Sequence, residues 1–123
     1  IMHILAVFIG GGLGSIARYG ISKVLLNLLP GNFPVGTILS NILACLIMGA
    51  VLYLYGNKVE SGYIRPFILI GFCGGFSTFS TFSLETVYLI KQNLLAYAAL
   101  NIAVSIISCL LILWLLVKQN SFS

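Results

Sequence analysis

The chain consists almost entirely of four apolar stretches, each long enough to cross a lipid bilayer as a helix. The hydrocarbon core of a bilayer is about 30 Å thick, which takes roughly 20 helical residues to cross. An open sheet cannot span lipid, because its edges would leave backbone groups without partners. We therefore expect an all-α membrane protein, one antiparallel four-helix domain over residues 1–123, with spans at about 4–29, 35–55, 66–90 and 94–117.

Composition argues against a water-soluble enzyme. Hydrophobic residues make up 60% of the chain and charged residues 7%, against about 25% charged in a soluble domain. The acids are Glu60 and Glu85, and the one histidine, His3, stands alone near the end, so there is no candidate nucleophile–base pair. The six basic residues form no cluster, which argues against nucleic-acid binding. The first apolar run lacks the basic flank of a cleavable signal peptide.

The three cysteines occur singly inside apolar runs, at positions 45, 73 and 109. Their spacing fits neither a zinc site nor a disulfide framework. We expect them to behave as small buried hydrophobic side chains.

The basic residues give the chain no strong orientation. Lys and Arg in short loops favour the cytoplasmic side of a membrane. Four spans place three basic residues on each side: Lys58, Arg65 and Lys118 against Arg18, Lys23 and Lys91. Either Arg18 lies too deep to count, or the protein inserts both ways and two opposite copies pair.

The third span contains the segment with the most distinctive chemistry, residues 71–83. The adjacent glycines Gly74 and Gly75 precede five hydroxyl residues within seven positions, and each glycine costs about 1 kcal/mol in a helix relative to alanine. We expect a break near mid-membrane, which would free carbonyls for cations and N–H groups for anions. The alternative is a glycine pair that merely permits tight packing.

Aromatic rings and hydroxyls alternate just after the expected break. Phe79 and Phe82 are three residues apart and share a helical face, and Thr78 lies four residues before Phe82. Ring edges carry positive charge and hydroxyls donate hydrogen bonds, so both could contact an anion. Alternatively, the rings are core residues and the hydroxyls bond to their own helix.

Further polar residues lie at membrane depth. Uncharged ones either hold helices together or line a path, and the scarcity of acids favours an anion over a cation. Glu85 is a vestibule residue or an ion-pair partner of Arg18 or a lysine. The candidates for these roles are Asn41, Arg18 and the fourth-span stripe Asn101, Ser105 and Ser108, whereas Gly10 and Gly14 predict close helix packing.

The whole chain resembles the bacterial Fluc (CrcB) family of fluoride channels. The resemblance rests on three motifs: the Gly-rich residues 11–19, Gly36-Thr37 through Asn41, and Gly71-Phe72-Cys73-Gly74-Gly75 through Phe82-Ser83. Ser40, Ala44 and Ser77 depart from residues common at their positions.

The resemblance implies a passive fluoride channel of the bacterial inner membrane. The family forms dual-topology homodimers, two antiparallel copies with two fluoride pathways. The implied pore residues are Phe79, Phe82, Asn41, Thr78, Thr81, Ser105, Ser108 and Arg18. Backbone carbonyls of Gly74 and Ser77 would hold a structural sodium ion (Na+) at the dimer axis.

Two rival functions remain open. A small proton-coupled multidrug exporter can also have four spans, but such exporters carry a glutamate in the first span, and this one has none. A non-transporting membrane scaffold would use the glycines for assembly and would tolerate replacement of Phe79 or Phe82.

Overall fold

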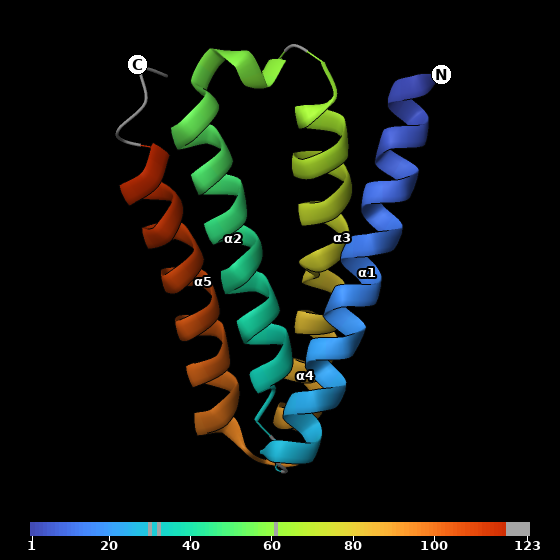
Figure 1. Ribbon diagram of the computed structural model, residues 1–123. Helices are drawn as coiled ribbons and strands as arrows, with labels where there is room; N and C mark the ends of the chain where they lie inside the picture. Colours follow the sequence, from blue (N-terminus) through green and yellow to red (C-terminus); the bar gives the residue numbers. More distant parts are fainter. Residues whose placement is uncertain (30, 32, 61, 118–123) are drawn as a thin grey trace.

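The computed structural model describes residues 1–29, 31, 33–60 and 62–117, in which four helical spans run antiparallel (Figure 1). The beginning of α1, the end of α5 and the link after α2 lie at one end of the molecule, and the other two links lie at the opposite end. Lys118 of the charge tally, and Pro30, Asn32 and Ser61 of the expected links, lie outside the described residues. The elements are α1 (Met2–Leu28), α2 (Val35–Tyr55), η1 (Gly56–Glu60), η2 (Arg65–Cys73), α3 (Gly74–Phe76), α4 (Phe79–Lys91) and α5 (Leu95–Val117).

The four expected spans are confirmed, each to within two residues at either end. Their length follows from the apolar runs, because the bilayer sets how many residues a spanning helix needs. The third span is made of η2, α3 and α4, and it is broken as the glycine pair and the hydroxyl residues predict. Its first segment, η2, is a π-helix, which the sequence does not predict.

The most extensive helix packing is that of α1 against η2 and α3 and of α2 against α5, and α1 also packs against α2. The glycines of α1 permit the first contact, since a Cβ on Gly10 would collide with the Phe67 carbonyl and one on Gly14 with the Phe72 carbonyl. Gly75 on α3 permits the same approach from the other helix, since a Cβ on it would collide with the Gly11 carbonyl. The expected close packing at Gly10 and Gly14 is therefore confirmed.

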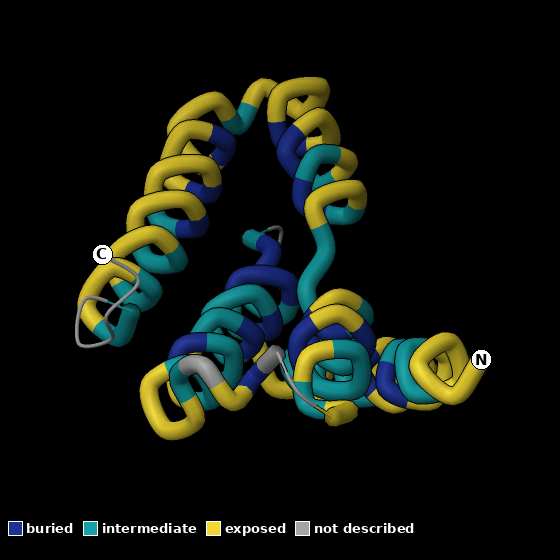
Figure 2. The backbone as a smooth tube through the Cα atoms, turned by 90° about the horizontal axis from the view of Figure 1, so that it is seen from above, coloured by how far each residue is buried: buried dark blue, intermediate teal, exposed yellow. Residues whose placement is uncertain are grey.

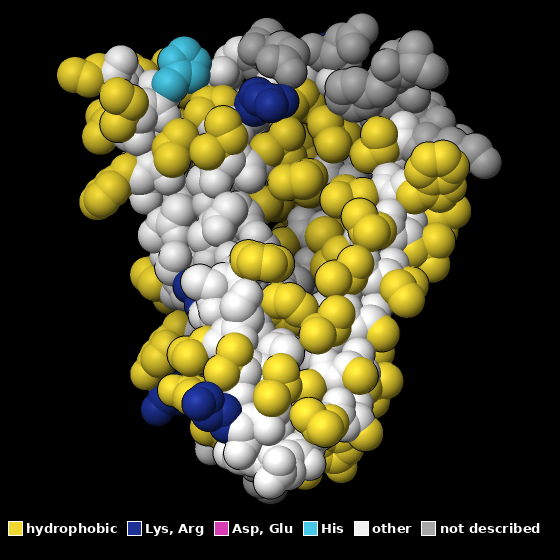
Figure 3. Space-filling model, turned by 180° about the vertical axis from the view of Figure 1, so that it is seen from behind, with side chains coloured by type: hydrophobic (Ala, Val, Ile, Leu, Met, Phe, Trp, Pro, Cys, Tyr) yellow, Lys and Arg dark blue, Asp and Glu magenta, His cyan; other side chains and the backbone are white. Residues whose placement is uncertain are grey.

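Most of the outer surface is apolar. Buried residues lie on the facing sides of the helices and exposed residues on their outer sides (Figure 2). Hydrophobic side chains are spread over the face in Figure 3, and Lys and Arg side chains lie mainly toward its two ends. This distribution suits a molecule surrounded by lipid.

Candidate functional site

The helix break consists of two extended residues, Ser77 and Thr78, between α3 and α4. Ser77 has φ −89° and ψ 161°, and Thr78 has φ −157° and ψ 122°. Thr78 caps α4, because its Oγ1 accepts a hydrogen bond from the Thr81 N–H at 3.1 Å. The Ser77 hydroxyl turns back and donates to the Cys73 carbonyl at 2.7 Å. Side chains of the break therefore bond to both flanking helices.

Asn41 of α2 is bonded to the break through both ends of its amide. Its Oδ1 accepts from the Thr78 N–H at 2.8 Å, and its Nδ2 donates to the Thr78 carbonyl at 3.4 Å. An amide nitrogen carries two hydrogens, so one remains for another acceptor. Asn41 thus holds the break in place and still has a donor available.

These bonds leave two backbone carbonyls without their usual helical donors. In a continuous helix the carbonyl of residue i accepts from the N–H of residue i+4. The donor for Gly74 would be the Thr78 N–H, which bonds Asn41, and the donor for Ser77 would be the Thr81 N–H, which bonds the Thr78 hydroxyl. Gly74 is exposed and Ser77 half-buried, so both positions remain accessible from the outer surface.

A cavity of about 250 Å³ adjoins the break, and most of the predicted pore residues line it. None of its lining residues carries a charge: they are Asn41, Cys45, Ser77, Thr78, Phe79, Phe82, Ser105, Ile106 and Cys109. The two rings lie together, with centroids 5.6 Å apart and planes tilted by 43°. Phe82 is buried, whereas Phe79 is 77% exposed and forms an open edge of the cavity.

A chain of hydrogen bonds joins α5 to α4 beside the cavity. The Ser105 hydroxyl donates to Asn101 Oδ1 at 3.3 Å, and Asn101 Nδ2 donates to the Thr86 hydroxyl at 2.9 Å. Thr86 donates in turn to the Phe82 carbonyl at 2.8 Å. Asn101 is fully buried, so it holds helices together, while Ser105 takes part in this chain and also faces the cavity.

Three residues predicted for the pore lie outside this cavity, and so does Gly74, which was predicted for the ion site. Thr81 and Ser108 are half-buried and are absent from its lining. Arg18 lies on α1, where its Nε donates to the Gly75 carbonyl at 3.1 Å. The arginine therefore contacts the chain just before the break rather than the cavity itself.

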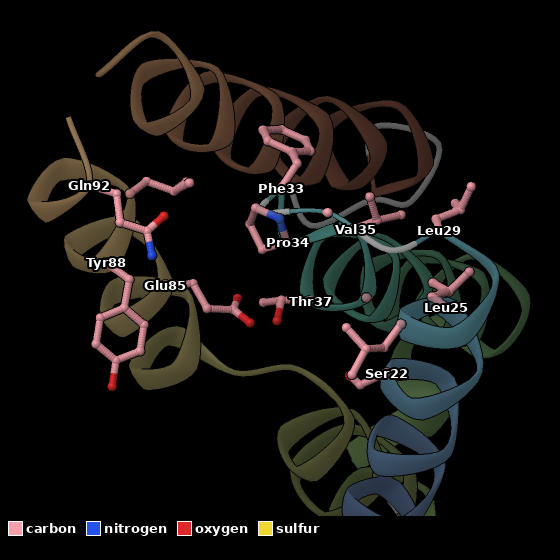
Figure 4. Close-up of a pocket in the computed structure, with 14 residues that line it drawn as sticks. Ser22, Leu25, Leu29, Phe33, Pro34, Val35, Thr37, Glu85, Tyr88 and Gln92 are labelled. Carbon is pink, nitrogen blue, oxygen red and sulfur yellow. The ribbon is translucent and has the colours of Figure 1, made fainter. Parts of the chain in front are cut away.

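Glu85 borders a second cavity, of about 320 Å³, between α1, α2 and α4 near the link that follows α1 (Figure 4). Its carboxylate points toward Thr37 rather than toward Arg18. One carboxylate oxygen of Glu85 is buried without a partner, and so is the hydroxyl of Ser40. Sequence reasoning missed the contact with Thr37, because nothing in the sequence indicates that these two spans meet there.

Two of the three cysteines also depart from expectation. Cys73 is buried, as predicted, but Cys45 and Cys109 are only half-buried and line the first cavity. Helical spacing offers a signal after the fact, since each lies four residues beyond a polar cavity residue, Asn41 or Ser105.

Comparison with known proteins gives one consistent result. The family model described as "CrcB-like protein, Camphor Resistance (CrcB)" matches residues 5–117. The chain is 42% identical over 117 residues to a protein of Coxiella burnetii named "Fluoride-specific ion channel FluC", covering 93% of this chain and 94% of that protein. It is 44% identical over 108 residues to "Fluoride-specific ion channel FluC 1" of Yersinia pestis, covering 84% of each. A third relative, from Rhodospirillum rubrum, is 38% identical over 93% of this chain and 91% of its own length.

Proposed function

The chain belongs to the CrcB family, and from this premise we propose that it is a fluoride-selective channel through which fluoride leaves the cell passively. Membership makes it a multi-pass protein of the bacterial inner membrane and a channel rather than an enzyme. The observation that carries the proposal is the uncharged cavity beside the helix break, where two phenylalanine rings meet polar side chains.

The cavity provides groups that can replace the water around a fluoride ion. Fluoride is small and strongly hydrated, so a pore must replace its water with other donors. The edges of Phe79 and Phe82 and the free hydrogen of Asn41 can do so. The first N–H groups of α4 have no acceptor within their helix and add a partial positive charge beside the rings. Cations find no carboxylate among the cavity-lining residues.

The remaining predicted residues would extend this path. Thr78, Thr81, Ser105 and Ser108 supply hydroxyls, although Ser105 would have to turn from Asn101 to donate to an ion. Arg18 would act at a distance, by attracting anions toward the break and by holding the Gly75 carbonyl. Glu85 and Thr37 would lie in the aqueous approach formed by the second cavity.

The proposed working unit is an antiparallel pair of copies with two pathways. Phe79 is 77% exposed, so the cavity is unfinished on that side in a single chain. A Cβ built on Gly12 would meet no other part of the chain within 4 Å, and a shallow apolar hollow extends over α1 from Val7 to Ile16 and reaches Gly75. A second copy seated there would find glycines that permit close approach. The equal division of basic residues agrees with insertion in both directions.

The residues present also fit a structural sodium ion. The Gly74 and Ser77 carbonyls have lost their helical donors, and unwound carbonyls in membrane helices are known ligands of sodium. Bound there, sodium would supply positive charge that offsets the facing carbonyls. The chain's own contribution is to hold these carbonyls in place through Asn41 and Thr78.

Anion efflux from liposomes containing the purified protein tests the proposal, with fluoride and chloride electrodes side by side. We expect fast fluoride release with little chloride release. Phe82→Ile should lose fluoride release while the dimer persists, whereas Phe76→Ile should retain it, because Phe76 is equally buried but lies outside the cavity. A well-folded dimer that releases no fluoride would overturn the proposal. Proton flux driven by a drug would instead support the exporter, and equal rates in both variants would refute the role of the ring.

A further inference from the structure

Cys45 and Cys109 lie opposite one another on two packed helices. Cys45 follows Asn41 by one turn of α2, and Cys109 follows Ser105 by one turn of α5. The helices α2 and α5 form one of the two main contacts of the fold. Both residues line the cavity that contains the phenylalanine rings, and the two thiols are close enough for their charges to interact. They therefore form a pair on the cavity wall rather than two isolated cysteines.

The pair has a ligand set that suits a particular class of metal ion. Among the described residues, no group of three or more His, Cys, Asp or Glu side chains comes together. A tetrahedral zinc site, which needs about four ligands, is therefore incomplete here. Two sulfurs alone suit soft ions that accept two ligands in a line, and thiolates select such soft ions over hard ones.

We infer that Cys45 and Cys109 form a two-thiol binding site for a soft d10 cation, of the class of Cu(I), Ag(I) or Hg(II), on the wall of this cavity. Two metal–sulfur bonds of about 2.3 Å in a line hold the sulfurs about 4.6 Å apart, so the site requires the two side chains to come to that separation. With Hg(II), two S–H bonds break, two S–Hg bonds form and two protons are released, so no oxidant or reductant is needed.

The inference has a functional consequence that rests on the proposed function. A metal held between the two sulfurs occupies space one helical turn from Asn41 and Ser105. The metal takes up only a small part of the cavity of about 250 Å³, but it lies on a wall that an anion must pass on its way along the rings. The bound metal would therefore slow fluoride release by narrowing the pathway.

Direct binding of Hg(II) to the purified full-length protein in detergent tests the site without measuring transport. The near-ultraviolet absorption of mercury–thiolate bonds, followed during titration against glutathione as a competitor, gives the affinity. We expect Cys45→Ser and Cys109→Ser each to weaken binding at least tenfold, since a single thiol competes no better than glutathione. Cys73→Ser is the matched control and should bind as the unmodified chain does, because Cys73 is 1% exposed and lies outside the cavity.

Fluoride release from liposomes with and without Hg(II) then tests the consequence, each variant being compared with its own metal-free rate. We expect Hg(II) to slow fluoride release in the unmodified chain and in Cys73→Ser, a dithiol to reverse this, and the other two variants to be at least tenfold less sensitive. Wild-type affinity in either Cys45→Ser or Cys109→Ser would overturn the paired site, as would loss of binding in Cys73→Ser. Absence of fluoride release before any metal is added would refute the proposed function, while the titration would still decide the site.

Discussion

Replacing Asn41 by aspartate gives the sharpest test of where the ion passes. The change keeps the acceptor for the Thr78 N–H at 2.8 Å but turns the donor that faces the Thr78 carbonyl at 3.4 Å into a second acceptor. The lost hydrogen bond is long, so we expect the free energy of unfolding to fall by only about 1 kcal/mol. The larger effect is electrostatic, because a carboxylate replaces an amide on the wall of the proposed anion pathway.

The size of the cavity sets the magnitude of that effect. A sphere of 250 Å³ has a radius of about 4 Å, so an anion at its centre lies about 4 Å from the new carboxylate. Two like charges at that distance repel by about 4 kcal/mol at an effective dielectric constant near 20. Each 1.4 kcal/mol corresponds to about tenfold, so fluoride release should fall by about a thousandfold.

Fluoride efflux from liposomes measures this, with Asn93→Asp as the control. Asn93 is exposed in the link between α4 and α5, at a φ of 62° that aspartate tolerates. The substitution therefore adds the same negative charge away from the cavity. We expect Asn93→Asp to release fluoride at the unmodified rate. Unmodified rates in Asn41→Asp, at both neutral and alkaline pH and with the dimer intact, would refute passage of the ion beside Asn41.

Other substitutions test the packing that supports the site. Gly14→Ala should lower the free energy of unfolding by about 3 kcal/mol, because the new Cβ meets backbone atoms that cannot move aside. Gly20→Ala should be neutral or slightly stabilising, because a Cβ there meets nothing within 4 Å. Thermal unfolding in detergent compares the two variants, and equal midpoints would contradict the packing. Ser40→Ala should raise stability by about 1 kcal/mol by removing a buried hydroxyl without a partner, and a destabilised variant would reveal a partner that the structure lacks. Asn101→Leu should cost about 2 kcal/mol, since it leaves two hydroxyls without their amide, and an unchanged unfolding midpoint would argue against that network.

The sequence predicts the spans well, because bilayer thickness and the apolar runs act locally. It also predicts a break in the third span, since Gly74, Gly75 and the hydroxyl residues that follow are weak helix formers in any context. The position of the break, at Ser77 and Thr78, depends on Asn41, which stands 37 residues away and accepts the Thr78 N–H. No local pattern contains that information.

In the candidate site too, some features follow from local sequence and others from distant residues. Phe79 and Phe82 share a face by helical spacing alone, and their contact follows from it. The bond from Arg18 to the Gly75 carbonyl and the meeting of Cys45 with Cys109 depend instead on which helices pack together and in what register. Polar residues at membrane depth could therefore be recognised as important from the sequence, while their partners could not.

The hydrogen bonds around the break also determine whether the third span can bend there. A hinge works where a few residues are free to absorb large changes in φ and ψ. Here hydrogen bonds restrain Ser77 and Thr78 from several sides. Arg18 bonds the preceding turn, Asn41 bonds the Thr78 backbone, and the two hydroxyls bond the chain before and after the break. The discontinuity is therefore a stiff joint rather than a hinge. If the cavity is the proposed pathway, its width is set by the side chains that line it and not by bending of the third span.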